Sequence, residues 1–339
     1  MTGAHVLVTG GAGFVGGEVV RLLARQGREV HALVRPRTGR VEPSGPGITR
    51  VEADLEDERA LRNAFEQAAS AARARGLPLD VVHLAARISY RRRDRELLRR
   101  VNVDGTRRVL AACRDSGVRR LCHVSSVVAL GPVARADEEL DDDAPLAGRA
   151  LASAYAATKA EAEELVLAAA GELDAVVASP AVVFGVSGGG SNSLHFLRRV
   201  LNGTLGPLSP PGSISVVGLA DAAQGIVTVL ERGTRGRRYL LSESPWRLHD
   251  LLTLACRSAG RTPPRGIVPR ALWSALVGAT ALADRVVASE RATPEALALL
   301  GLHFRFRARR APAELGWSPR PFPEVLGSIV AELGRGERA

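Results

Sequence analysis

The chain has 339 residues, 46% of them hydrophobic and 24% charged, which is typical of a globular protein and argues against a disordered or fibrous one. The net charge of +10 comes from basic residues scattered along the sequence, and the aromatic side chains that stack on bases make up only 4%, so we expect no nucleic-acid partner. Three cysteines without paired spacing indicate a reducing, cytoplasmic compartment without a disulfide framework, and we expect no metal site.

The first predicted element is an apolar strand at residues 5–8, and a glycine-rich turn follows it directly. Because the chain enters this strand at once, we expect no signal peptide. Gly10, Gly13 and Gly16 allow a tight turn, close approach of the backbone to a pyrophosphate, and close packing of the helix that follows. The start of that helix offers free N–H groups to phosphates. Strand, turn and helix together predict dinucleotide binding; the alternative is a plain glycine-rich turn.

A second strand, residues 29–34, ends at Arg35, and Arg37 follows closely. An NAD-binding unit usually carries an acidic residue about 20 residues after the glycines, where it holds the adenosine ribose hydroxyls. An arginine at this place suits a 2′-phosphate, so we predict NADP(H) as the preferred cofactor, with NAD possible. The alternative is that Arg35 is an ordinary surface arginine in an arginine-rich chain.

Strands and helices continue to alternate as far as Pro180. We expect strands at residues 48–52, 81–86, 119–124 and 174–179, and helices at residues 57–75 and 155–170. This alternation predicts the α/β class, with a Rossmann-type, doubly wound parallel sheet that binds ligands at the carboxyl ends of its strands. Ser125 and Ser126 stand at one such end. We interpret His83, inside an apolar run, as a core residue and residues 141–143 as a solvated acidic loop.

The pattern changes after Pro180. Residues 184–193 form a Gly/Ser-rich loop that could close over a substrate pocket. Later segments are mostly helical, at residues 194–201, 219–231, 248–258, 271–289 and 324–333, with short strands at 215–217 and 238–241. The apolar stretch 271–283 is too short for a transmembrane segment. We therefore expect a dinucleotide-binding domain at residues 1–180, with a contribution from about 215–235, and a smaller substrate lobe at residues 181–339.

Lys159 is the single lysine among 46 basic residues, and it lies four positions after Tyr155. On a helix this spacing places both side chains on one face. An ammonium near a phenol lowers the pKa of the phenol and makes it a usable acid or base, which a bulky guanidinium does less well. The pair therefore predicts proton-transfer chemistry; the alternative is an accidental surface pair.

Taken together, these signals resemble the extended short-chain dehydrogenase/reductase family over nearly the whole chain. The ordered motifs are Thr9-Gly10-x-x-Gly13-x-x-Gly16, Asp54-Leu55, His83-Leu84-Ala85-Ala86, Asn102-Val103-x-Gly105-Thr106, Ser125-Ser126, Tyr155-x-x-x-Lys159 and Ser179-Pro180-Ala181-Val182-Val183-Phe184-Gly185. The resemblance implies that Tyr155 is the general acid/base, and that Lys159 binds the nicotinamide ribose and lowers the Tyr155 pKa. It also implies that Ser126 holds the substrate oxygen, because the catalytic serine of the family lies five residues before a glycine, here Gly131.

The resemblance also implies where the cofactor lies. Gly10, Gly13, Gly16 and the N–H groups of Phe14 and Val15 would face the pyrophosphate, Arg35 the 2′-phosphate, Asp54 and Leu55 the adenine, and Pro180 and Val183 the nicotinamide, with Ala85 and Ala86 in close contact. Asn102 is interpreted as structural.

Two departures concern the branch of the family. Sugar-nucleotide epimerases and dehydratases usually have arginine where this chain has Ser179, and a further arginine where residues 211–217 contain none. The pattern is closer to dihydroflavonol-reductase-like and 3β-hydroxysteroid-dehydrogenase-like enzymes, which interconvert ketones and secondary alcohols. We therefore expect a ketoreductase acting on a small-molecule ketone or alcohol, possibly as a homodimer. The alternatives are a nucleotide-sugar epimerase or dehydratase with tightly bound NAD, and a non-catalytic dinucleotide-binding protein.

Overall fold

The computed structural model describes residues 4–36, 43–187, 192–204, 206–284 and 293–336. Its centre is a seven-stranded sheet in which every pairing is parallel, in the order β10-β6-β5-β4-β1-β2-β3. The strands are β1 (His5–Thr9), β2 (Val30–Val34), β3 (Ile48–Glu52), β4 (Leu79–His83), β5 (Arg120–Val124), β6 (Ala175–Pro180) and β10 (Arg238–Leu241). The strand order reverses between β1 and β4, which creates the crevice where open α/β sheets bind ligands.

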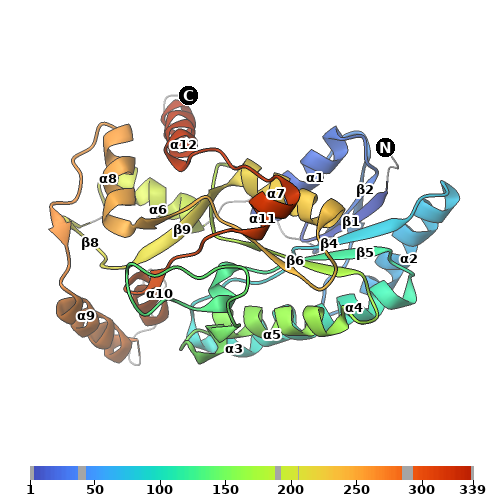
Figure 1. Ribbon diagram of the computed structural model, residues 1–339, viewed down its shortest axis with the longest axis horizontal. Helices are drawn as coiled ribbons and strands as arrows, with labels where there is room; N and C mark the ends of the chain where they lie inside the picture. The colour runs from blue at the N-terminus through green and yellow to red at the C-terminus, as the bar shows by residue number, and fades with distance from the viewer. Residues whose placement is uncertain (1–3, 37–42, 188–191, 205, 285–292, 337–339) are drawn as a thin grey trace.

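Helices cover both faces of this sheet and make three layers (Figure 1). One face packs against α1 (Phe14–Arg25) and α7 (Leu219–Arg232), and the other against α2 (Glu58–Ala74), α4 (Gly105–Asp115) and α5 (Ala154–Ala169). Strands such as β1, β2 and β4 are buried along their whole length, because a sheet covered on both faces needs continuous apolar strands. The predicted Rossmann-type α/β fold is confirmed.

The C-terminal half forms a second lobe, at the left of Figure 1. It contains a small sheet with the order β11-β9-β13, in which β7 also pairs with β9, and a separate β12-β8 pair. Its strands are β7 (Val182–Phe184), β8 (Leu208–Ser209), β9 (Ser213–Gly218), β11 (Ser244–Arg247), β12 (Gly266–Ile267) and β13 (His303–Phe304). Its helices are α6 (Asn192–Leu201), α8 (Leu248–Ser258), α9 (Arg270–Ala283), α10 (Pro294–Leu300) and α12 (Phe322–Gly336). The short helix α11 (Arg310–Leu315) packs instead against α7 and β10 of the large sheet.

Several details of this half were not predicted. Most of the missed strands have only two to four residues, too few to show the alternation of apolar and polar side chains that marks a strand. The predicted helix 271–289 ends at Ala283, and residues 285–289 lie outside the described part, as do Arg37 and residues 188–191 of the predicted loop. In the described ranges, no helix is long and apolar enough to cross a membrane.

The prediction of a solvated loop at residues 141–143 is wrong at Asp142, which is buried. Its carboxylate accepts backbone hydrogen bonds from Leu240 at 2.7 Å, Arg309 at 2.8 Å and Arg310 at 3.1 Å. A carboxylate can be buried when several N–H groups satisfy it. Asp142 therefore ties the acidic segment to the edge strand β10 and to the start of α11.

Candidate active site

The glycine turn between β1 and α1 is shaped by close backbone contacts. Gly10 has a φ of +73°, and a Cβ there would lie 2.9 Å from the backbone of Ala85. A Cβ on Gly16 would lie 2.1 Å from the carbonyl oxygen of Gly10. The N-cap of α1 is Gly13, whose lack of a side chain leaves the first turn uncapped. The helix start is therefore open to an anion, as dinucleotide binding requires.

The remaining predicted cofactor residues follow the carboxyl ends of neighbouring strands. Arg35 is exposed directly after β2, Asp54 and Leu55 follow β3, and Ala85 and Ala86 follow β4. Pro180 ends β6, and Val183 lies in β7. Since β3, β2, β1, β4, β5 and β6 are consecutive parallel neighbours, these positions lie at one end of the sheet, except Val183, whose strand β7 pairs with β9 in the second sheet. That end fits an extended dinucleotide with the glycine turn near its centre.

Tyr155, Lys159 and Ser126 meet where β5 ends and α5 begins. Ser153 caps the helix by accepting a hydrogen bond from the Ala156 N–H at 3.2 Å, so Tyr155 lies in the first turn. The Ser126 side chain lies next to the Tyr155 phenol and acts on its pKa as a hydrogen-bond partner. One turn further along α5, the Lys159 ammonium donates a hydrogen bond of 2.8 Å to the carbonyl oxygen of Val124. The structure therefore brings all three predicted catalytic residues together.

Burial shifts the pKa values of both Tyr155 and Lys159 on α5. It raises the pKa of Tyr155 well above its ordinary value, the Tyr90 phenol adds to the rise, and the hydrogen bond with Ser126 opposes it. Burial also lowers the pKa of Lys159 to about 8, against the opposing effect of the Glu163 carboxylate. Loss of solvation dominates the Tyr155 pKa here, and the lowering by Lys159 that the resemblance implies stays a prediction. Near neutral pH the phenol is protonated and the ammonium is charged.

The neighbouring serine has a different role. The Ser125 hydroxyl is buried and donates to the Glu163 carboxylate at 2.5 Å, and that carboxylate also forms a buried ion pair with Arg238 of β10. Glu163 lies four residues after Lys159 on α5. Ser125 therefore belongs to a network that joins α5 to the sheet, and Ser126 is the serine next to Tyr155.

His83 is a buried structural residue, as predicted. Its Nδ1 accepts from the Thr9 hydroxyl at 2.7 Å, and its Nε2 lies 3.1 Å from the Thr106 hydroxyl, which itself donates to a backbone carbonyl at 2.6 Å. The Thr106 oxygen must therefore accept from Nε2, which fixes the tautomer. Burial lowers the His83 pKa to about 3, so the ring is neutral.

Asn102 also makes structural contacts. Its amide exchanges hydrogen bonds of 2.8 and 3.0 Å with the backbone of Arg87, and it donates to the Thr158 hydroxyl at 3.1 Å. Asn102 lies in the single π-helical turn Arg99–Asp104, which precedes α4. It holds the segment after β4 against α5.

Sequence reasoning missed two residues next to the predicted catalytic tyrosine. The Tyr90 ring lies edge-to-face with Tyr155, with 6.1 Å between centroids. Glu295 of α10 hydrogen-bonds the Ser153 side chain, its charge raises the pKa of Tyr90, and burial raises its own pKa. The Glu295 Oε1 atom is buried and has no hydrogen-bond partner within the described ranges. No local motif could have indicated either residue, since Glu295 comes from the distant second lobe.

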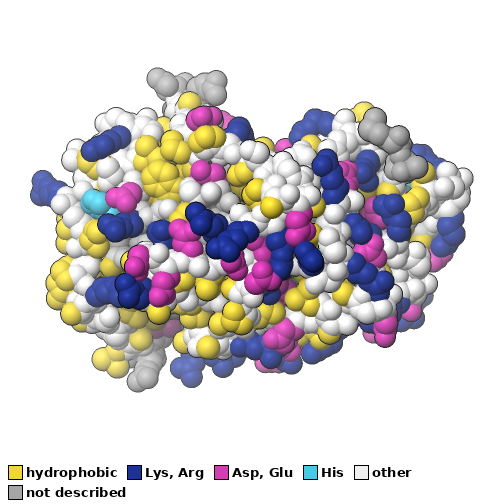
Figure 2. Space-filling view, viewed as in Figure 1, with side chains coloured by type: hydrophobic (Ala, Val, Ile, Leu, Met, Phe, Trp, Pro, Cys, Tyr) yellow, Lys and Arg dark blue, Asp and Glu magenta, His cyan; other side chains and the backbone are white. Residues whose placement is uncertain are grey.

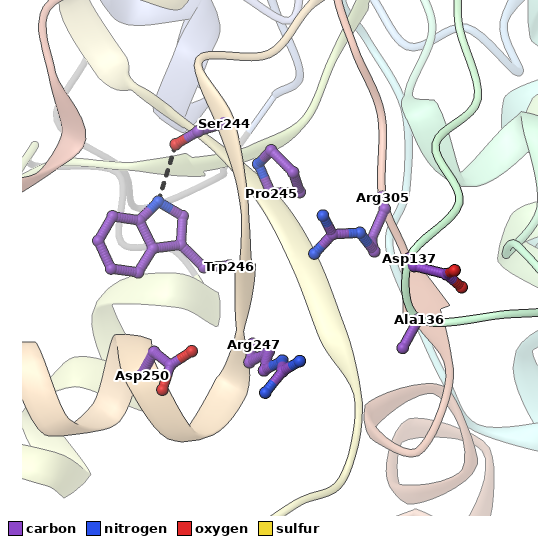
Figure 3. A pocket seen from close by; sticks show the side chains of 8 residues that line it. All are labelled: Ala136, Asp137, Ser244, Pro245, Trp246, Arg247, Asp250 and Arg305. Carbon is purple, nitrogen blue, oxygen red and sulfur yellow. Dashed lines mark hydrogen bonds between the residues drawn. The ribbon is translucent and has the colours of Figure 1, made fainter.

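A cavity of about 980 Å³ lies in the second lobe. Figure 3 shows Arg305 and Asp137 across the groove from β11, where Trp246 donates a 2.8 Å hydrogen bond to the Ser244 hydroxyl. The lining contains none of the predicted catalytic residues: Ala136, Asp137, Ser244, Pro245, Trp246, Arg247, Asp250 and Arg305. Basic and acidic groups alternate in this groove, so it is no simple anion site.

Comparison with known proteins agrees with this geometry. A model of the "NAD dependent epimerase/dehydratase family" matches residues 6–241. A 4-hydroxy-2-methyl-3-oxo-4-farnesyl-3,4-dihydroquinoline-1-oxide ketoreductase of Stigmatella aurantiaca is 31% identical, covering 93% of this chain and 92% of the relative. Sterol demethylase protein B of Methylococcus capsulatus is 29% identical, covering 96% and 97%.

Among solved structures, the UDP-glucose 4-epimerase of Thermus thermophilus in complex with NAD has a TM-score of 0.74 at 24% identity. The match covers 97% of this chain and 99% of that one, and it supports the fold. The chain therefore belongs to the NAD dependent epimerase/dehydratase family, within the extended short-chain dehydrogenases/reductases.

Proposed function

We propose that this protein is an NADP(H)-dependent ketoreductase that interconverts a ketone and a secondary alcohol. The observation that carries the proposal is the placement of Ser126 just after β5 and of Tyr155 and Lys159 one turn apart on α5, with the Lys159 ammonium held by the last residue of β5. A binding protein without catalysis has no need of such a set. The similarity to a ketoreductase over 93% of the chain supports the same reaction class.

The chain offers a complete set of contacts for the cofactor. The uncapped start of α1 and Gly10, Gly13 and Gly16 would hold the pyrophosphate, and the exposed guanidinium of Arg35 would bind the 2′-phosphate of NADP(H). The other contacts would come from Phe14, Val15, Asp54, Leu55, Ala85, Ala86, Pro180 and Val183, with Lys159 at the ribose. The bound nicotinamide supplies or accepts the hydride.

Residues of the chain itself would carry out the proton transfer. Ser126 donates a hydrogen bond to the substrate carbonyl oxygen and stabilises the negative charge that develops there. Tyr155, held protonated by burial, donates its proton to the same oxygen. Lys159 keeps a positive charge next to the phenol as it becomes a phenolate, while Glu163 helps to keep the ammonium charged. A protonated phenol is the form that can donate a proton during ketone reduction.

The proposal is tested by mixing the protein with NADPH and a panel of apolar cyclic ketones. A fall in absorbance at the reduced-nicotinamide band that depends on both protein and ketone would support it. Tight NADPH binding with no absorbance change for any ketone would count against it.

A nucleotide-sugar epimerase is the second candidate, and the groove lined by Arg247 and Arg305 is the observation in its favour, since two arginines can hold a diphosphate. However, Arg305 is already paired with Glu139 at 3.0 Å, and Asp137 and Asp250 line the same groove. An epimerase would copurify with NAD and show no net cofactor consumption. Thermal stabilisation by a nucleoside diphosphate, and not by apolar ketones, would favour it.

A further inference from the structure

Helix α9 exposes an unusually apolar surface for a helix at the end of a molecule. Every residue after Arg270 in this helix is uncharged, and Trp273 is its only buried side chain. Leu272, Leu276 and Leu282 are 63%, 46% and 64% exposed. In Figure 2 hydrophobic side chains gather at the lower left of the molecule, where Figure 1 places α9. Exposed apolar patches of this kind mark interaction sites.

The β12-β8 pair carries two further exposed apolar side chains. Ile267 of β12 is 44% exposed and Leu208 of β8 is 47% exposed. We refer to Leu208, Ile267, Leu272, Leu276 and Leu282 as the α9 surface. These five include most of the large, strongly exposed hydrophobic side chains in the described part of the chain.

A second cavity, with a basic lining, opens next to this surface. Its volume is about 350 Å³, and Ile267 contributes to its wall. The described lining contains two arginines and two histidines and no carboxylate: Ala136, Pro210, Pro211, Gly212, Arg247, His249, Ile267, Val268, Pro269, Arg270 and His303. Burial lowers the pKa of His303, and the charges of Arg270, Arg305 and Arg247 lower it further, which reports a positive local potential. A phosphate fits this chemistry.

The α9 surface and the basic cavity beside it together indicate one binding partner. We propose that the α9 surface docks this protein on an anionic phospholipid bilayer, with α9 lying in the plane of the interface and a headgroup phosphate at Arg247 and Arg270. Apolar side chains beside cationic groups are the pattern of interfacial helices. The 14 residues of α9 span only about 21 Å, less than the roughly 30 Å of a hydrocarbon core. The helix can therefore lie on a bilayer and cannot cross it.

A second copy of the chain is the competing occupant, and charge argues against it. A two-fold symmetric contact places the same patch on both sides of the interface. Arg265 precedes β12 and Arg270 begins α9, so such a contact would bring the basic groups of both copies into one interface. No described acidic residue in the α9 surface or the adjacent cavity would neutralise them. Anionic lipid headgroups would neutralise these arginines.

This docking would bring the bilayer close to the proposed active site. Trp273 anchors α9 to α10 by donating to the Leu297 carbonyl oxygen at 3.1 Å. Glu295 of the same α10 contacts Ser153, which caps the helix that carries Tyr155. One short helix therefore separates the α9 surface from the tyrosine. The docking itself does not depend on the proposed reaction.

The test is sedimentation of the full chain with vesicles of phosphatidylcholine alone and of phosphatidylcholine with an equal part of phosphatidylglycerol. We expect sedimentation with the mixed vesicles that weakens in high salt. The double variant Leu272→Ser with Leu276→Ser should bind about tenfold more weakly or worse, and Arg270→Gln should bind several-fold more weakly. Arg59→Gln, an exposed arginine on α2 at the opposite end, is the matched control and should bind as the wild type does.

The assay needs neither cofactor nor turnover, so its failure is distinct from failure of the proposed function. Circular dichroism and thermal unfolding check that each variant is folded, as expected for exposed positions. A wild-type protein that stays in solution with both vesicle types would overturn the proposal, as would a double variant that sediments fully. A wild-type protein that binds no vesicles and forms a dimer, with the double variant monomeric, would also overturn it. So would binding of free inorganic phosphate without vesicle binding.

Discussion

The Lys159 ammonium is hydrogen-bonded to the carbonyl oxygen of Val124, the last residue of β5, at 2.8 Å. This contact fixes the one lysine of the chain between a strand end and the helix that carries Tyr155. It satisfies only one of the three N–H donors of the ammonium. The cost of burying the charge is visible in a pKa lowered from 10.5 to about 8.

The first prediction is that Lys159 makes stability depend on pH. Between pH 8 and 10.5 the unfolded chain binds more protons at this lysine than the folded chain, so the free energy of unfolding rises with pH across that window. For the cofactor-free protein, the free energy of unfolding of Lys159→Met relative to wild type should fall by about 2 kcal/mol between pH 7 and 9.5. Urea unfolding at both pH values measures it, and a constant difference would contradict the buried-charge account.

The second prediction concerns the glycine turn and has a matched control within α1. A Cβ on Gly16 would lie 2.1 Å from the Gly10 carbonyl oxygen, whereas a Cβ on Gly17 would meet its nearest atoms at 3.5 Å. Gly16→Ala should lower the free energy of unfolding by roughly 2 kcal/mol or more and weaken cofactor binding. Gly17→Ala should raise it by about 0.5–1 kcal/mol, because alanine favours the helix. Equal thermal stability of the two variants would show that the turn is not this tight.

The third prediction concerns the buried ion pair below the active site. Glu163 is fully buried and pairs with Arg238, so Glu163→Gln leaves a buried guanidinium without its counter-charge. The free energy of unfolding should fall by about 3–5 kcal/mol. Adding Arg238→Met should restore part of the loss, because the unpaired charge is then gone. No recovery in the double variant would mean that packing, and not charge, governs this position.

The fourth prediction concerns cofactor choice. Arg35 is exposed at the end of β2 and free to meet a 2′-phosphate. Arg35→Asp should raise the Kd for NADPH by about 10- to 100-fold, the range expected for a charged hydrogen bond, and leave NADH binding nearly unchanged. Arg59→Asp on α2 controls for the change in net charge. Unchanged NADPH affinity in Arg35→Asp would show that the 2′-phosphate binds elsewhere.

The sequence could predict those parts of the fold that depend on local patterns of apolar, polar and glycine residues. Strand and helix alternation predicted the doubly wound sheet, and the rule that ligands bind at carboxyl ends pointed to Ser125 and Ser126 together. Only the family resemblance favoured Ser126. The single lysine, four positions after Tyr155, indicated that both residues lie on one face of a helix. Glu295 and Asp142 could not be predicted, because their roles come from partners far away in the chain. The burial that raises the Tyr155 pKa could not be read from residue spacing either.

The central claim is that Tyr155 is the proton donor in ketone reduction by NADPH, and one comparison tests it most directly. Turnover by Tyr155→Phe is measured from the reduced-nicotinamide absorbance, with cofactor binding followed separately by fluorescence. The control is Tyr239→Phe, a buried tyrosine whose hydroxyl donates to Glu314 at 2.8 Å, distant from the predicted catalytic residues along the chain. The account predicts that Tyr155→Phe loses about 10²- to 10⁴-fold in kcat and keeps its NADPH affinity, while the control stays active. Equal turnover by Tyr155→Phe and the wild type would contradict it.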